Sequence, residues 1–217
     1  MENSISPKNA GRAVGILYVI GTTLGIASAA LVAPVTGADD VVASASRHGT
    51  ALTAGAFAIL GMAVALALIP VFAYPVLSLV SKTLARAHAL LRGVVEFGAY
   101  LPLVASLLLL ANLGEYGGDE ALGKALANQE SLSGLVAAGF LAGATVFYTA
   151  LWRGRLVPRW ISGWGLIATL PYLVATVLTV LGVFESSAPT AMGLFAPLGL
   201  QEMVLAVWLI ARGFATR

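Results

Sequence analysis

The sequence contains no cysteine and few charged residues. Without cysteine, the chain can form no disulfide bond, no thiolate metal site and no cysteine nucleophile. Charged residues make up only 10% of the chain, whereas roughly 25% is usual for a soluble domain. Hydrophobic residues make up 59% of it. This composition excludes an ordinary soluble domain and is typical of an integral membrane protein.

The uncharged residues are grouped in long apolar runs. A helix needs about 20 predominantly apolar residues to cross a bilayer, and the runs reach that length. Because little sequence remains outside them, we expect one all-α domain over residues 1–217, a polytopic membrane protein built as a bundle of six transmembrane helices. The approximate spans that we predict are residues 13–35, 51–74, 90–112, 132–152, 161–183 and 191–212.

The placement of the Lys and Arg residues predicts the orientation of this bundle. If the N-terminus is inside the cell, the cytoplasmic segments hold ten of the 12 Lys and Arg residues, and the outer loops hold only Arg47 and Lys124. Positive residues accumulate on the cytoplasmic side of membrane proteins. We therefore expect both termini in the cytoplasm. This placement explains the net charge of +2, so we expect membrane lipids and no nucleic acid as partners.

Two polar segments are expected outside the membrane. Residues 34–50 are predicted to form a solvated loop, and residues 114–131 an acidic loop with a short surface helix. Gly118 to Lys124 gives GxxxxGK, which nearly matches a phosphate-binding loop. Ala125 stands where that motif needs Ser or Thr, and no strand is predicted before it. We therefore reject a nucleotide site here.

The third apolar run carries a regular series of polar residues. His88, Arg92, Glu96 and Tyr100 follow one another at intervals of four, which places them on one face of an α-helix. An ionisable group at the bilayer centre costs roughly 2.5 to 3.5 kcal/mol on insertion scales. This face is therefore predicted to turn toward other helices and to find partners there, with His88 as a secondary candidate near the inner side.

The last apolar run contains a second polar feature. Pro197 and Gly199 loosen the helix just before Gln201 and Glu202, which are predicted to lie near the middle of the membrane. Broken helices with ionisable groups at that depth line substrate or ion sites in many transporters. They also occur as simple kinks with buried, hydrogen-bonded acids. The sequence leaves both interpretations open.

A charge count links the two runs. Two buried acids and one buried base cannot all be ionised and neutralised, so we predict that one carboxyl group carries a proton. Our hypothesis is that Arg92 pairs with Glu202 and leaves Glu96 to exchange that proton. The alternative is a structural ion cluster that holds the helices in register. A ligand or proton site would comprise Arg92, Glu96, Tyr100, Gln201 and Glu202.

The histidines argue against other kinds of chemistry. His48 is predicted outside and His88 near the inner face, so they cannot share a metal ion, and a Ser-His-Asp triad lacks its Asp. We expect no metal and no cofactor.

Four segments of the chain resemble a known family. GRAVGILYVIG, LLRGVVE, GRLVPRWISGWGL and LQEMVLAVWLIARGF are similar, in order and spacing, to landmarks of the bacterial membrane family known as domain of unknown function 4386. Gln201 departs from the pattern, in which Gly precedes the Glu. The resemblance spans nearly the whole chain and implies a six-helix protein of the bacterial plasma (inner) membrane, with no established activity. The matching residues are Arg12, Tyr18, Arg92, Pro158, Arg159, Glu202, Trp208, Leu209 and Gly213.

Three functions are compatible with these observations. The leading hypothesis is a polar intramembrane site that binds or transports a small or amphiphilic molecule, coupled to a proton. The second is an intramembrane enzyme that acts on a lipid, with Glu96 or Glu202 as general acid or base. The third is a non-catalytic membrane partner subunit. A transporter needs a pocket open to one side that both acids reach, whereas an enzyme needs a lateral opening to lipid.

Overall fold

The fold was analysed in a computed structural model, which describes residues 5–128, 130–183, 185 and 188–215. Within these residues the chain is helical and contains no strand. Six helices of the described part are long and apolar enough to cross a membrane. The predicted all-α, polytopic fold is therefore confirmed. Arg217, one of the ten Lys and Arg residues predicted to be cytoplasmic, lies outside the described residues.

In the described part of the chain, six membrane-spanning units are built from nine helical elements. The third unit is one continuous helical segment, in which two α-helices are joined by a short π-helix. In chain order the elements are α1 (Pro7–Thr36), α2 (Val41–Val80), α3 (Lys82–Leu90), the π-helix η1 (Leu91–Glu96), α4 (Phe97–Tyr116), α5 (Glu120–Ala127), α6 (Glu130–Gly154), α7 (Arg159–Val180) and α8 (Pro189–Arg212).

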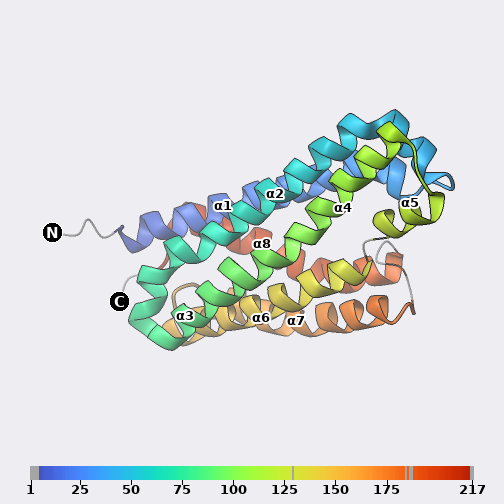
Figure 1. The fold of residues 1–217 in the computed structure, drawn as a ribbon. Helices are drawn as coiled ribbons and strands as arrows, with labels where there is room; N and C mark the ends of the chain where they lie inside the picture. Colours follow the sequence, from blue (N-terminus) through green and yellow to red (C-terminus); the bar gives the residue numbers. More distant parts are fainter. Residues whose placement is uncertain (1–4, 129, 184, 186–187, 216–217) are drawn as a thin grey trace.

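Both termini lie at one end of the bundle (Figure 1). At this end, which we name the terminal end, Phe214 N donates to Pro7 O at 3.4 Å and Ala215 N donates to Leu156 O at 2.8 Å. These bonds join the start of α1, the end of α8 and the α6–α7 turn. The opposite end, with the α1–α2 connection and α5, is named the loop end.

The six spanning units form two groups of three. Figure 1 shows α1, α2 and α4 diverging from α6, α7 and α8 toward the loop end. A core of buried side chains joins the two groups, with Tyr18, Ile69, Phe147, Ile161 and Leu205 among its members. A second core lies mainly within the first group and includes Leu52, Leu103 and Leu110. Toward the loop end the buried side chains therefore belong mostly to the first group.

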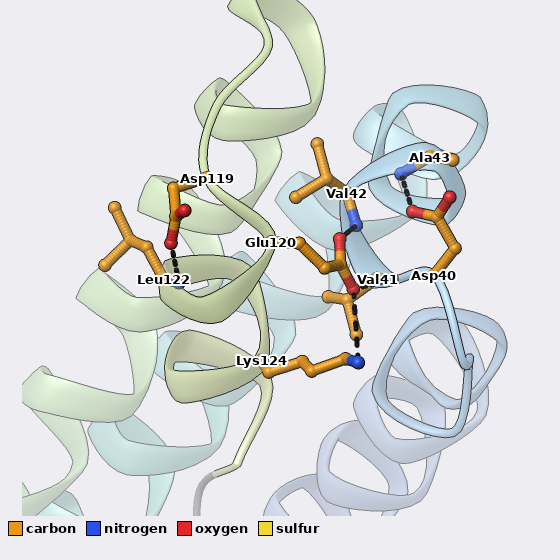
Figure 2. Close-up of polar contacts among 8 residues, drawn as sticks. All are labelled: Asp40, Val41, Val42, Ala43, Asp119, Glu120, Leu122 and Lys124. Atoms are coloured by element: carbon orange, nitrogen blue, oxygen red, sulfur yellow. Dashed lines mark hydrogen bonds and ion pairs between the residues drawn. The ribbon is translucent and has the colours of Figure 1, made fainter.

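The start of α2 differs from the prediction. Residues 34–50 were expected to be a solvated loop, but α2 begins at Val41, and only His48 departs from helical geometry, with φ −121° and ψ 21°. The physical reason is capping. Asp40 accepts a hydrogen bond from Ala43 N at 2.9 Å, and the Glu120 carboxylate accepts from Val41 N at 2.8 Å and from Val42 N at 3.0 Å (Figure 2). These acids satisfy amide groups that a helix start leaves unpaired.

The predicted short surface helix of the acidic loop is present as α5. Asp119 caps it by accepting from Leu122 N at 2.9 Å (Figure 2). Lys124 Nζ lies 3.9 Å from Glu120 Oε1, on the helix that Asp119 begins. Ser106 Oγ on α4 donates to Leu126 O at 2.6 Å and fastens α5 to the bundle. Lys124 therefore sits on a packed surface helix.

Candidate functional site

The two charged residues of the polar series in the third spanning unit lie on a π-helix. η1 covers Leu91–Glu96 and contains both Arg92 and Glu96, each only 1% exposed. π-Helical turns are rare and are found frequently at functional sites. The four-residue spacing of the stripe predicted a single inward face but did not distinguish an α-helical from a π-helical turn. The change of helix type is a feature that the sequence analysis missed.

Two glycines of α6 form the surface on which η1 rests. A Cβ at Gly139 would lie 3.3 Å from Glu96 Cα, and a Cβ at Gly143 would lie 3.4 Å from Arg92 N. A Cβ at Gly139 would require a shift of a few tenths of an ångström, and a Cβ at Gly143 would just reach van der Waals contact, so neither position has room for a side chain larger than a methyl group. Glycine pairs spaced by four residues let membrane helices approach closely. Here the pair positions the backbone of the two charged residues.

The Arg92 guanidinium is enclosed by charged and aromatic side chains. Its Nη1 lies 3.5 Å from Glu96 Oε2, and its Nη2 lies 3.7 Å from Glu202 Oε1. Its Cζ lies 5.2 Å from the centre of the Tyr18 ring and 5.3 Å from that of Phe140. Aromatic faces attract cations at such distances. The guanidinium therefore contacts α1, α6 and α8 as well as its own helix.

The approach of Arg92 to Glu202 agrees with the sequence hypothesis, but the position of Glu96 does not. Glu96 was expected to be left without Arg92, yet it lies slightly closer to the guanidinium than Glu202 does. The reason is local: the two residues are four apart on one helix, so their side chains meet without any help from tertiary packing. One guanidinium is thus shared by two carboxyl groups. That one of these groups carries a proton stays a prediction.

A cavity of about 690 Å³ lies between the two helix groups beside these charges. Arg92, Glu96, Tyr100 and Glu202 all line it. Every spanning unit contributes to its wall, and five aromatic side chains face it. These aromatic residues are Tyr18, Tyr100, Phe140, Tyr172 and Phe195.

Several polar atoms at the cavity have no hydrogen-bond partner among the described residues. They include both carboxylate oxygens of Glu96, Oε1 of Glu202, and Nε and Nη1 of Arg92. Buried polar groups in native proteins are nearly always hydrogen-bonded, and each exception needs an explanation. The lining of this cavity therefore offers acceptors and donors that a polar group of a bound molecule can use.

Two predicted residues lie elsewhere. Gln201 is fully buried but does not line the cavity; its Nε2 donates to Ile161 O at 2.9 Å and ties α8 to the start of α7. His88 is fully buried too, with Nδ1 3.3 Å from Gly143 O and its ring stacked on Phe147 at 4.6 Å. Both side chains are held by neighbouring helices. The structure gives them packing contacts rather than a place at the cavity.

The aromatic wall was not identified from the sequence. Phe140, Tyr172 and Phe195 stand singly in apolar runs, where nothing separates a cavity-lining ring from a core ring. Phe140 and Tyr172 pack with ring centres 5.2 Å apart, and Tyr172 and Phe195 with centres 4.7 Å apart. Tyr18 had a weak signal as one of the landmarks of the family pattern.

Comparison with known proteins identifies the family of the chain. No curated protein and no solved structure was found to match it. Residues 13–213 match the family described as Domain of unknown function (DUF4386), which confirms the resemblance seen in the sequence. Because this match covers nearly all of the 217 residues, the chain belongs to the DUF4386 family of proteins.

Proposed function

We propose that the central cavity binds a small or amphiphilic molecule and moves it across the membrane in a step coupled to a proton. The observation that carries this proposal is the meeting of Glu96 and Glu202, from different spanning units, at one cavity beside a single guanidinium. A carboxyl group in a membrane interior is costly and is found mainly where it serves a pathway or a proton relay.

The position of the cavity supports transport. It lies where two groups of three helices diverge, and transporter sites are typically found at such interfaces near the bilayer midplane. Its lining includes Ile26 and Met192, which are 67% and 60% exposed, whereas Arg92 is 1% exposed. The lining therefore runs from the enclosed guanidinium to side chains at the surface. Rocking of one helix group against the other would change which end is open.

The proposed orientation follows the charge distribution. We infer that the terminal end, which carries Lys8, Arg12, Arg155, Arg159 and Arg212, faces the cytoplasm of a bacterial cell. The cavity, whose lining runs along α1 from Tyr18 to Ile26 and along α8 from Glu202 to Met192, would then extend toward the outside.

Native mass spectrometry of protein extracted in a mild detergent tests the proposal. We expect a bound small molecule on the wild-type chain. A Cβ at Gly199 or at Gly193 of α8 would meet no atom within 4 Å, but only Gly199 lines the cavity. Gly199→Phe should therefore displace the bound molecule, and Gly193→Phe should retain it.

Transport is tested with the molecule so identified. In liposomes that contain the wild-type protein, an imposed pH gradient should drive its uptake, and Glu202→Gln should abolish the coupling. Absence of any adduct on the wild-type chain, or an adduct that Gly199→Phe leaves in place, would contradict a binding function of this cavity.

A further inference from the structure

We infer that the ligand of the central cavity is a lipophilic organic cation, and that it exchanges for a proton on the carboxyl pair. This inference rests on the proposed function and specifies the chemical class of its substrate. Three observations carry it: the charge balance of the cavity lining, the state of the carboxylate oxygens and the composition of the wall.

The first observation is the charge balance. Among the described residues, the charged side chains that line the cavity are Arg92, Glu96 and Glu202, so ionisation of both acids leaves one negative charge in excess. Arg92 is already surrounded by the two carboxyl groups and by the rings of Tyr18 and Phe140. Its positive charge is therefore balanced by groups of the protein itself. The excess charge can be balanced by a proton or by a cationic guest.

The second observation concerns the oxygens that would meet the guest. Neither Glu96 oxygen has a hydrogen-bond partner among the described residues, although the side chain is 1% exposed. Oε1 of Glu202 is in the same state, and this residue is 15% exposed. Glu202 is thus the more accessible of the two carboxyl groups. An incoming cation would reach it first.

The third observation is the wall itself. Aromatic rings from α1, α4, α6, α7 and α8 face the cavity, and α2 adds the apolar side chains of Met62 and Leu66. Aromatic faces attract organic cations, most strongly where water is excluded, and cages of such rings recognise quaternary ammonium groups. A small hydrated ion would gain little here. An organic cation with apolar substituents fits both the aromatic and apolar wall and the excess negative charge of the ionised carboxyl pair.

The exchange conserves charge in the cavity. A protonated carboxyl group loses its proton as the organic cation enters, the cation pairs with the resulting carboxylate, and the proton leaves through the open end to water. No covalent bond other than the O–H bond is broken. Binding the proton and the organic cation together would leave an excess positive charge in the cavity, which is unfavourable in free energy. Binding of either one therefore favours release of the other.

The remaining ionisable groups around the pair are phenols and one imidazole. Tyr18 on α1, Tyr100 on α4 and Tyr172 on α7 line the cavity, and Tyr148 on α6 is buried nearby. α2 contributes no ionisable side chain to the lining. His88 on α3 is turned to Phe147 and away from the cavity. The carboxyl pair is therefore the part of the lining to which we assign the proton exchange.

Two probes of nearly the same shape and opposite charge test this inference. Binding of tetraphenylphosphonium and of tetraphenylborate to the purified protein is measured by calorimetry in weak buffer, together with any proton release. We expect the cation to bind with release of up to about one proton, and the anion to bind at least about tenfold more weakly.

Matched variants locate the effect. Glu202→Gln should weaken tetraphenylphosphonium binding about tenfold or more and reduce proton release, whereas Glu115→Gln, at an exposed residue of α4, should change neither. Thermal unfolding of each variant shows whether it has kept its fold. If Glu202→Gln unfolds, the wild-type protein is used to test the exchange instead. Its apparent affinity for tetraphenylphosphonium should then fall about tenfold for each unit by which the pH is lowered.

The outcomes separate this inference from the proposed function. If the protein prefers tetraphenylborate, and Gly199→Phe abolishes this binding, the inference of a cationic ligand is overturned. The proposed binding function of the cavity is then retained. Binding of neither probe would also overturn the inference, and the adduct seen by native mass spectrometry would then decide the proposed function separately. Cation binding without proton release would refute the exchange.

Discussion

Gly143 of α6 lies directly against Arg92 of η1, so that a Cβ on the glycine would be 3.4 Å from both N and Cβ of the arginine. This contact allows η1, which is buried and carries charged residues, to pack closely against α6. It links a small-residue pair, which is common in membrane helices, to the position of the ionisable groups at the cavity.

Enlarging Gly143 should therefore displace η1. Gly143→Val should lower the free energy of unfolding by about 1–3 kcal/mol, the usual cost of overpacking a core, and should weaken ligand binding at the cavity. Gly98→Val is the control, because a Cβ at Gly98 on α4 meets no atom within 4 Å. Thermal unfolding in detergent measures both variants, and equal behaviour of the two would show that α6 does not support η1.

Removing the buried positive charge of Arg92 should lower the free energy of unfolding strongly, unless both acids are made neutral in the same variant. Arg92→Met leaves Glu96 and Glu202 without a positive partner, and breaking a buried ion pair in this way costs about 3–5 kcal/mol. The triple variant Arg92→Met, Glu96→Gln, Glu202→Gln should recover most of that stability. Chemical unfolding of the two variants gives the difference, and no recovery in the triple variant would mean that the loss arises from packing alone.

The carboxylate of Glu120 should stabilise the start of α2. Glu120→Ala removes two charge-assisted hydrogen bonds to Val41 N and Val42 N, with an expected loss of about 1–2 kcal/mol. Lys124→Ala should cost much less, because its contact with Glu120 is exposed. Hydrogen exchange of the first amides of α2 should rise in Glu120→Ala only; a similar rise in Lys124→Ala would assign the effect to the exposed contact instead.

His88 should matter for stability and not for binding. His88→Ala removes a fully buried ring that stacks on Phe147, and large-to-small changes in a core cost about 2–5 kcal/mol. Affinity for tetraphenylphosphonium should stay within about twofold of the wild type in molecules that remain folded. A selective loss of affinity would give the imidazole a direct role at the cavity.

The absence of cysteine makes the orientation easy to test. In otherwise unchanged chains, Glu115→Cys near the loop end should react with a membrane-impermeant maleimide added to intact cells. Ala215→Cys at the terminal end should react only after the cells are broken. The reverse pattern would place the termini outside and would contradict the orientation inferred from the positive residues.

Much of the fold could be predicted from the sequence because a bilayer imposes simple requirements. The six crossings follow from apolar length, and an even number of crossings brings both ends of the chain to the same side. The inward face of Arg92 and Glu96 follows from the cost of charge in lipid. The start of α2 was predicted wrongly, since its polar first turns resemble a loop unless the distant Glu120 is known to cap them.

The sequence by itself determined that the chain is a six-helix membrane protein with ionisable groups in its interior, because hydrophobic length and the cost of buried charge are local properties of a segment. The tertiary structure alone decided that the Arg92 guanidinium, which meets Glu96 on its own helix, also meets Glu202 of α8, that Gln201 and His88 lie away from the cavity, and that rings from several helices line it. These features depend on which helices meet and at what separation, and helix periodicity carries no information about either.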